Sequence, residues 1–170
     1  LAKGLECGAD LLEIDVRRSA DGCLVVIHDR TLERTTNGKG LVKDYMLKEL
    51  KGLDAGKGEE IPTLREVLDF VRRAGARLII EIKEVGTEQA IVQEVRGVGL
   101  ESSAIFVSFD PGSVRKAKEL LPEAGTGLIY SRPLGNPVGF AKSLRADILL
   151  PRFNLATRDL VESVHRHGLR

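Results

Sequence analysis

The sequence predicts an α/β fold built from parallel βα units. Short runs of apolar residues alternate along the chain with segments that carry the helical period of about 3.6 residues. Several of the runs are almost continuous Val, Ile and Leu, the composition of strands buried on both faces of a sheet. This alternation favours a parallel sheet covered by helices. An open doubly wound sheet and a (β/α) barrel both fit the pattern.

Six apolar runs are predicted as strands. They span residues 11–16, 24–28, 77–83, 104–109, 127–131 and 147–151. The first two are joined by Ala20-Asp21-Gly22, a tight turn that leaves no room for a crossover helix. We therefore expect a hairpin at the front of the chain and parallel units after it.

Capping residues mark where the helices between the strands begin. Thr63 followed by Glu66 is a capping box, the segment after it has a helical apolar period, and Gly75 is a stop signal. Asp110 followed by Pro111 combines an N-cap with a proline at the first helical position. Two more helices are predicted to begin at Thr87 and Thr157.

Length and composition indicate one folded domain over residues 1–170. The chain is 42% hydrophobic, and its 26 basic and 25 acidic residues leave a net charge of +1, which argues against a nucleic-acid partner. No apolar run is long enough to span a bilayer. A cytoplasmic location is the default expectation. Cys7 and Cys23 are predicted as small core or boundary side chains.

Polar residues interrupt the apolar runs near the ends of three strands. Glu13 and Asp15 are two residues apart, so in a strand their carboxylates project from the same face. His28 stands at the tip of the second strand, and Glu81 and Lys83 share a face of the third. Because function gathers at the carboxyl ends of strands in barrels and open sheets, we interpret these five residues as a site.

The residue types in this group indicate phosphate chemistry. One acidic residue at a strand end is readily explained by a salt bridge, but charges buried without partners cost several kcal/mol each. Three neighbouring carboxylates repel unless a cation intervenes. Oxygen ligands favour a hard ion, so the cofactor is predicted to be Mg²⁺, Ca²⁺ or Mn²⁺. Lys83 would neutralise phosphoryl oxygens beside that ion, and His28 would move a proton.

A long series of short motifs extends the pattern from about residue 8 to residue 84. The motifs are Gly8-Ala9-Asp10, Glu13-x-Asp15-Val16, Asp21-Gly22, Val25-Val26-x-His28-Asp29, Leu32-x-Arg34-Thr35-Thr36, Gly40, Glu49-Leu50-x-x-Leu53-Asp54, Ile61-Pro62-Thr63-Leu64 and Ile80-Glu81-Ile82-Lys83. Together they make the chain resemble the glycerophosphodiester phosphodiesterase family. The likeness is looser through Val107-Ser108-Phe109 to residue 170.

The resemblance implies a (β/α)8 barrel and a reaction. Members of the family use a divalent ion to cleave glycerophosphodiesters to sn-glycerol 3-phosphate and an alcohol. By this likeness Glu13, Asp15 and Glu81 are metal ligands, His28 is one of two catalytic histidines, and Lys83 lies near the substrate phosphate.

Two features depart from the family pattern. The sequence has no His-Arg-Gly motif, which the family carries on its first strand with the other catalytic histidine, and it has no Trp, which the family places on a late strand. We therefore expect one barrel domain truncated at both ends, with about six of the eight strands present and the first and last missing. The exposed edges of strands 11–16 and 147–151 would invite pairing with a second copy. Unless another chain or flanking sequence supplies both missing strands, we expect the isolated chain to be nearly inactive and poorly soluble.

Two other functions remain open at this stage. One is a phospholipase D-like phosphodiesterase, such as a sphingomyelinase D-like enzyme, with the same metal site and another substrate. The other is a non-catalytic truncated barrel that acts as an interaction module.

Overall fold

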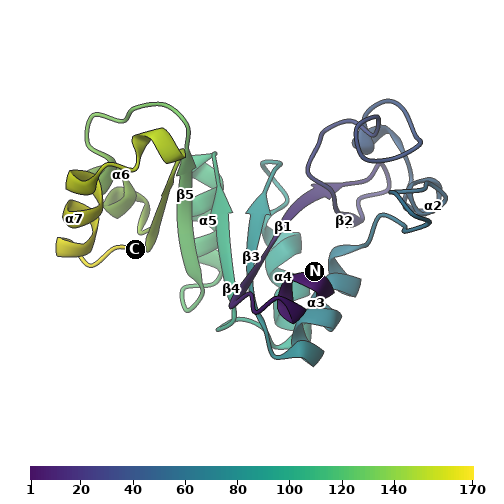
Figure 1. Cartoon of the computed structure of the whole chain (residues 1–170), viewed down its shortest axis with the longest axis horizontal. Coiled ribbons are helices and arrows are strands. Elements are labelled where there is room, and N and C mark those ends of the chain that lie inside the picture. The colour runs from purple at the N-terminus through teal and green to yellow at the C-terminus, as the bar shows by residue number, and fades with distance from the viewer.

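A computed structural model describes all residues 1–170, and its centre is one six-stranded sheet (Figure 1). The strands are β1 (Leu11–Arg18), β2 (Leu24–Val26), β3 (Arg77–Ile82), β4 (Ala104–Ser108), β5 (Gly125–Tyr130) and β6 (Ile148–Pro151). Their order is β2-β1-β3-β4-β5-β6. All neighbours are parallel except β1 and β2, which are antiparallel. The six predicted strands and the front hairpin are therefore confirmed, and five strands have the direction of barrel strands.

Helices follow most of the strands. They are α1 (Ala2–Glu6), α2 (Leu47–Lys51), α3 (Leu64–Ala74), α4 (Glu88–Val98), α5 (Pro111–Leu120), α6 (Pro137–Leu144) and α7 (Arg158–Arg166), with short 3-10 helices η1 (Val42–Asp44) and η2 (Phe153–Leu155). In Figure 1 the segment from β2 to α2 lies at one end of the sheet, and α6 and α7 lie at the other. No helix is both long and apolar enough to cross a membrane.

The predicted helix starts are confirmed at atomic detail. The backbone N–H of Glu66 donates to Thr63 Oγ1 at 3.2 Å, and the Glu66 carboxylate accepts from the Thr63 N–H at 2.7 Å. Such a capping box typically stabilises a helix by about 1 kcal/mol. Gly75 ends α3 with φ of 63°, a left-handed conformation that glycine adopts without strain. Asp110 caps α5 by accepting from the Ser113 N–H at 2.6 Å.

The hairpin between β1 and β2 is closed by side-chain hydrogen bonds. Ser19 Oγ donates to the Asp21 carboxylate at 2.6 Å and accepts from the Cys23 N–H at 2.9 Å. Gly22 has φ of 85°, which the turn requires. Strand β2 ends at Val26, two residues earlier than predicted, so His28 lies in the loop just beyond it.

The main core lies between the sheet and α3, α4 and α5. Alternate residues of β1 and β3 face these helices and are buried, among them Ile14, Val16, Ile80 and Ile82. Burying each such side chain stabilises the fold by roughly 1.5–3 kcal/mol. The intervening residues point to the opposite face, which we call the inner face. Glu13, Asp15 and Glu81 occupy intervening positions, so the alternation places them on the inner face.

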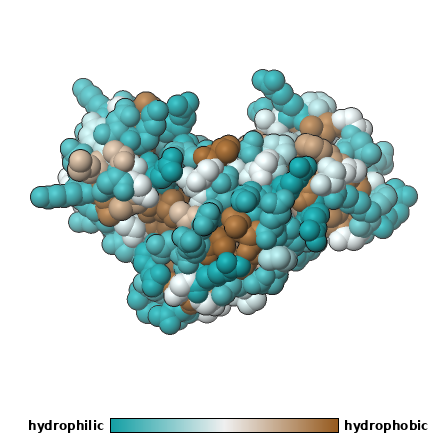
Figure 2. Space-filling model, turned by 180° about the vertical axis from the view of Figure 1, so that it is seen from behind, coloured by the Kyte–Doolittle hydropathy of each residue, from teal (hydrophilic) through white to brown (hydrophobic).

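The sheet is an open arc, so the fold is an incomplete (β/α)8 barrel. Residues 11–15 of β1 have no strand on their outer side, and β6 is the other end of the sheet. Beside β6 the backbone of Arg170 accepts from the Leu149 N–H at 2.8 Å and donates to the Asp147 carbonyl at 3.0 Å, so it continues the parallel pattern by one residue. The inner face lines a cavity of about 470 Å³. Figure 2 shows the molecule hollowed between two flanks, with hydrophobic atoms at the floor.

Candidate active site

Strand register brings the predicted acidic residues together. Asp15 on β1 is the direct partner of Glu81 on β3, so their side chains leave the sheet side by side on the inner face. Glu13 precedes Asp15 by two residues and Lys83 follows Glu81 by two, which keeps both on that face. The arrowheads of β3, β4 and β5 in Figure 1 point to the same edge of the sheet. Glu81 and Lys83 flank Ile82, the last residue of β3, so they lie at that edge.

Lys83 lies between two of the carboxylates. Its Nζ is 2.9 Å from Asp15 Oδ1 and 2.6 Å from Glu81 Oε1. All three side chains are largely buried, with 12%, 15% and 10% of their surface exposed. Burial by itself would lower the pKa of Lys83, but its hydrogen bonds with Glu81 and Asp15 outweigh burial and raise this pKa above 10.5. Lys83 is therefore a fixed positive charge within an acidic group.

The three carboxylates fit a hard divalent ion. Oxygen atoms of Glu13, Asp15 and Glu81 all lie within 4.8 Å of one another. Ligand oxygens at about 2.1–2.5 Å from one ion are separated by at most about 5 Å, so the spacing suits Mg²⁺, Mn²⁺ or Ca²⁺. Burial raises the pKa of the Glu13 carboxyl, and the charges of Asp15 and Glu81 raise it further, while Lys83 and His28 oppose the shift only in part. A cation at this point would relieve that repulsion.

His28 is exposed and held by its neighbour. Its Nδ1 is 2.5 Å from Asp29 Oδ1, and 61% of the imidazole-bearing side chain remains accessible. Arg34 in turn donates to both oxygens of Asp29, at 2.5 and 2.9 Å. The Arg34 guanidinium, followed by His28, holds the pKa of Asp29 well below its usual range. Asp29 is therefore ionised, and its contact with Nδ1 orients the imidazole ring.

Arg17 was missed by the sequence reasoning. Its buried guanidinium donates to the His28 carbonyl through Nε at 3.0 Å and Nη2 at 2.8 Å. Its Nη1 is 3.6 Å from Glu84 Oε1. The signal was present, because Arg17 follows Asp15 by two residues on the same face of the strand. Arg17 thus fixes the backbone of the loop that carries His28.

Phe109 was also missed as a site residue. It follows β4 directly, and 53% of its surface is exposed. It lines the cavity of the inner face together with Glu13, and a smaller cavity of about 220 Å³ together with Glu81 and Lys83. Phe109 therefore gives both cavities an exposed apolar wall.

The other two histidines of the chain lie outside the acidic group. His165 and His167 are exposed at the end of α7. The turn at residues 32–38 is stabilised by its own hydrogen bonds, since Thr36 Oγ1 donates to the Leu32 carbonyl and accepts from the Gly38 N–H.

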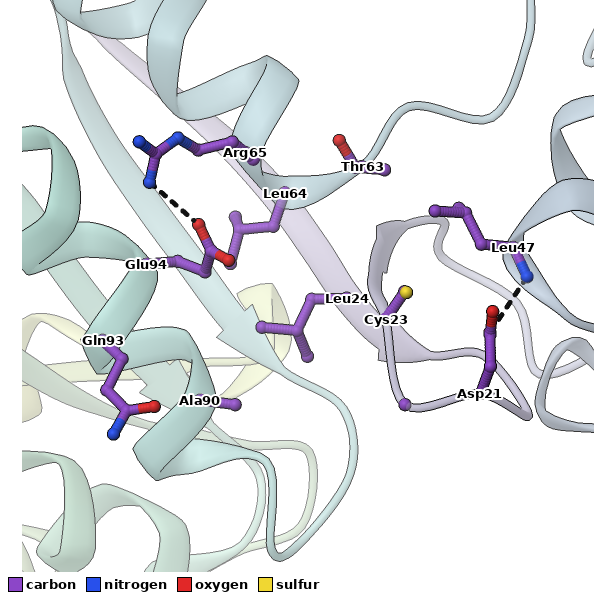
Figure 3. A pocket seen from close by; sticks show the side chains of 11 residues that line it. Asp21, Cys23, Leu24, Leu47, Thr63, Leu64, Arg65, Ala90, Gln93 and Glu94 are labelled. Atoms are coloured by element: carbon purple, nitrogen blue, oxygen red, sulfur yellow. Dashed lines mark hydrogen bonds and ion pairs between the residues drawn. The ribbon is translucent and has the colours of Figure 1, made fainter.

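The placement of Cys7 in a core or boundary position is wrong. Cys7 is exposed because it follows the short helix α1, which buries none of its side chains. Cys23 is partly buried beside a cavity of about 490 Å³ on the outer side of the hairpin (Figure 3). The charges of that cavity already have partners, such as Arg65 with Glu94 at 3.2 Å, and it shares no residue with the acidic group.

Fold and site together define the class. Carboxylates and a lysine on neighbouring parallel strands, with a histidine in the loop after the front hairpin, in an incomplete (β/α)8 barrel, are the arrangement of a barrel enzyme. The profile of the glycerophosphoryl diester phosphodiesterase family matches residues 1–170. The chain belongs to this family.

Individual relatives agree with the family assignment. The chain is 37% identical to a glycerophosphodiester phosphodiesterase of Caldanaerobacter subterraneus, over 99% of the chain and 74% of that protein. It is 35% identical to one of Bacillus altitudinis, over 95% of the chain and 72% of that protein.

Solved structures show the same fold. A crystal structure of a glycerophosphodiester phosphodiesterase from Agrobacterium tumefaciens superposes with a TM-score of 0.85 at 30% identity, covering 99% of this chain and 75% of that one. A phosphodiesterase from Oleispira antarctica, solved with the product sn-glycerol-3-phosphate, gives 0.86 at 30% identity, covering 97% and 72%.

Proposed function

We propose that the protein hydrolyses glycerophosphodiesters to sn-glycerol 3-phosphate and an alcohol, with the help of a divalent metal ion. The observation that carries the proposal is the convergence of three carboxylates and Lys83 within hydrogen-bonding and ligand distances at one edge of the sheet. The product complex of the Oleispira antarctica relative supports the choice of product.

The ion would be held by Glu13, Asp15 and Glu81. When bound, it supplies positive charge to the phosphoryl oxygens and helps to orient the phosphate. Mg²⁺, Ca²⁺ and Mn²⁺ all suit an oxygen-only ligand set. The carboxylates must be ionised to bind it, so the raised pKa of Glu13 makes metal affinity fall as the pH falls.

The remaining residues would bind the phosphate and move the proton. Lys83 would hold a phosphate oxygen, since its Nζ is already held beside Asp15 and Glu81. In the overall hydrolysis, water oxygen bonds to phosphorus, the bond from phosphorus to the alcohol oxygen breaks, and a proton from water ends on the alcohol. His28, oriented by Asp29, would transfer a proton as a general acid or base.

A direct assay separates this function from its alternatives. With the first and last barrel strands supplied, we expect the protein to release sn-glycerol 3-phosphate from glycerophosphocholine when Mg²⁺, Ca²⁺ or Mn²⁺ is present, and we expect hydrolysis to stop when a chelator is added. Sphingomyelin should be a poor substrate in the same assay. Cleavage of sphingomyelin alone would favour the phospholipase D-like alternative, and cleavage of neither compound with any of the three ions would favour a non-catalytic interaction module.

Lys83→Met is expected to weaken binding of the anionic phosphate. Methionine is similar in size to lysine but carries no charge. The change therefore removes a buried positive charge and leaves Asp15 and Glu81 without their common partner. We expect KM to rise by roughly tenfold or more, since a charge-assisted hydrogen bond is about twice as strong as a neutral one. Steady-state kinetics measures this, with the exposed Lys48→Met as the control. Unchanged KM and kcat would remove Lys83 from the site.

A cytoplasmic location and pairing of the open sheet edges between copies remain predictions. Native mass spectrometry of the protein would show whether a dimer forms.

A further inference from the structure

A second cavity adjoins the acidic group and has the opposite charge. It measures about 260 Å³ and is lined by Arg17, Arg30, Leu41, Lys43, Lys83 and Glu84. Four of its six lining residues are cationic and only one is acidic. Lys83 lines this cavity, but none of the three predicted metal ligands does. We call it the cationic pocket.

The fold brings these residues together from three separate segments. Arg17 and Lys83 come from the ends of the neighbouring strands β1 and β3. Arg30 and Lys43 belong to the loop after β2, where Thr31 forms an antiparallel bridge with Leu41 and the Val42 N–H donates to the Arg30 carbonyl at 3.0 Å. This local pairing holds Arg30 and Lys43 beside each other over the strand ends.

Two of the four cations already have partners. Arg17 is occupied by the His28 carbonyl and lies 3.6 Å from Glu84, and Lys83 is held by the carboxylates of the metal group. The ion pairs of the pocket involve these two cations only. Arg30 and Lys43 are therefore exposed charges that face a shared cavity without an anion of their own. Such an arrangement favours an anionic ligand, and above all a phosphate, which accepts several charge-assisted hydrogen bonds.

We propose that the cationic pocket binds a second anionic group, carried by the alcohol half of the substrate, so that the preferred substrates are glycerophosphodiesters of phosphorylated alcohols. This inference rests on the proposed function. The proposed function places the phosphate to be cleaved at Lys83 and the carboxylates. Lys83 also lines the cationic pocket, so the pocket adjoins that phosphate. The glycerol half carries only hydroxyl groups, so the additional charge must lie on the alcohol.

The test uses two substrates that differ by one phosphate group, glycerophosphoinositol and glycerophosphoinositol 4-phosphate. We expect kcat/KM of the native protein to be roughly tenfold or more higher for the phosphorylated compound, through one or two charge-assisted contacts. This preference should shrink as salt is added, because Arg30 and Lys43 are both exposed and salt screens exposed charges. In the double variant Arg30→Gln/Lys43→Gln the preference should largely disappear.

Matched controls lie close to the pocket. Arg18 is exposed and points to the opposite side of β1 from Arg17, and Lys39 is exposed on the same loop as Lys43 but outside the pocket. The double variant Arg18→Gln/Lys39→Gln removes the same net charge, so it should keep the native preference. Equal losses in both double variants would mean that only the overall charge matters, and would overturn the proposal.

A binding measurement separates failure of this inference from failure of the proposed function. Titration calorimetry with the two compounds, without added metal, should show tighter binding of the phosphorylated compound and loss of this difference in Arg30→Gln/Lys43→Gln. If neither compound is cleaved but this difference is seen, the pocket is confirmed and the proposed reaction is wrong. If both are cleaved and bound equally well by the native protein, the reaction is supported and the pocket is not a substrate site.

Discussion

Replacing Glu81 with Gln is expected to reduce kcat/KM by roughly 10³-fold, the effect of losing several kcal/mol of charge stabilisation. Glu81 contacts both the predicted metal ligands and the predicted phosphate-binding lysine. It pairs with Asp15 across the strands, and its Oε1 lies 2.6 Å from Lys83 Nζ. Glutamine keeps the size and part of the hydrogen bonding but removes the charge. We therefore expect metal affinity to fall by more than the roughly 10–100-fold typical of a lost outer-shell partner.

The measurements are metal titration by calorimetry and steady-state hydrolysis of glycerophosphocholine, with thermal unfolding to check the fold. Glu60→Gln is the matched control, since Glu60 is exposed and distant in sequence from the group and pairs only with Lys51. A Glu81→Gln protein that hydrolyses the substrate normally without added metal would show that the site is wrongly assigned.

Replacing His28 with Ala is expected to slow turnover by about 10²–10⁴-fold, the usual contribution of a proton-transfer group. His28 is exposed, oriented by Asp29, and outside the set of carboxylates that fit an ion. The variant should therefore bind the metal as the native protein does, which distinguishes a proton-transfer role from a ligand role. The loop should keep its path, because Arg17 binds the backbone carbonyl rather than the ring.

A second variant tests how the imidazole is oriented. Asp29→Asn removes the carboxylate that contacts Nδ1 and loosens the contact with Arg34, so we expect a smaller loss of kcat and a changed pH profile. His165→Ala is the control, since this histidine is exposed on α7 far along the chain. Loss of metal binding in His28→Ala would instead make His28 a ligand.

Much of the fold could be predicted because its signals are local. The capping box at Thr63, the cap at Asp110 and the tight turn at Gly22 each depend on a few neighbouring residues, and all three form as expected. Strand limits depend on the partner strand, and β2 ends before His28 because its pairing with β1 covers only three residues on each strand. Strand β2 runs antiparallel to the other five strands, as the hairpin turn predicts.

The sequence by itself determined which residues share a face of a strand. A strand repeats every two residues, so Glu13 with Asp15, and Glu81 with Lys83, had to project together wherever the strands lay. The same rule applies to Arg17, whose role was nevertheless not apparent before its partner was seen.

Only the tertiary structure decided what these faces meet. The pairing of Asp15 with Glu81, the contact of Arg17 with the His28 carbonyl and the approach of Arg30 to Lys43 each join segments that are distant along the chain or folded back on one another. Such contacts follow from strand register and loop closure, which are set by packing of the whole core. A short window of sequence carries the period of a strand, but it does not carry the identity of the strand's neighbour.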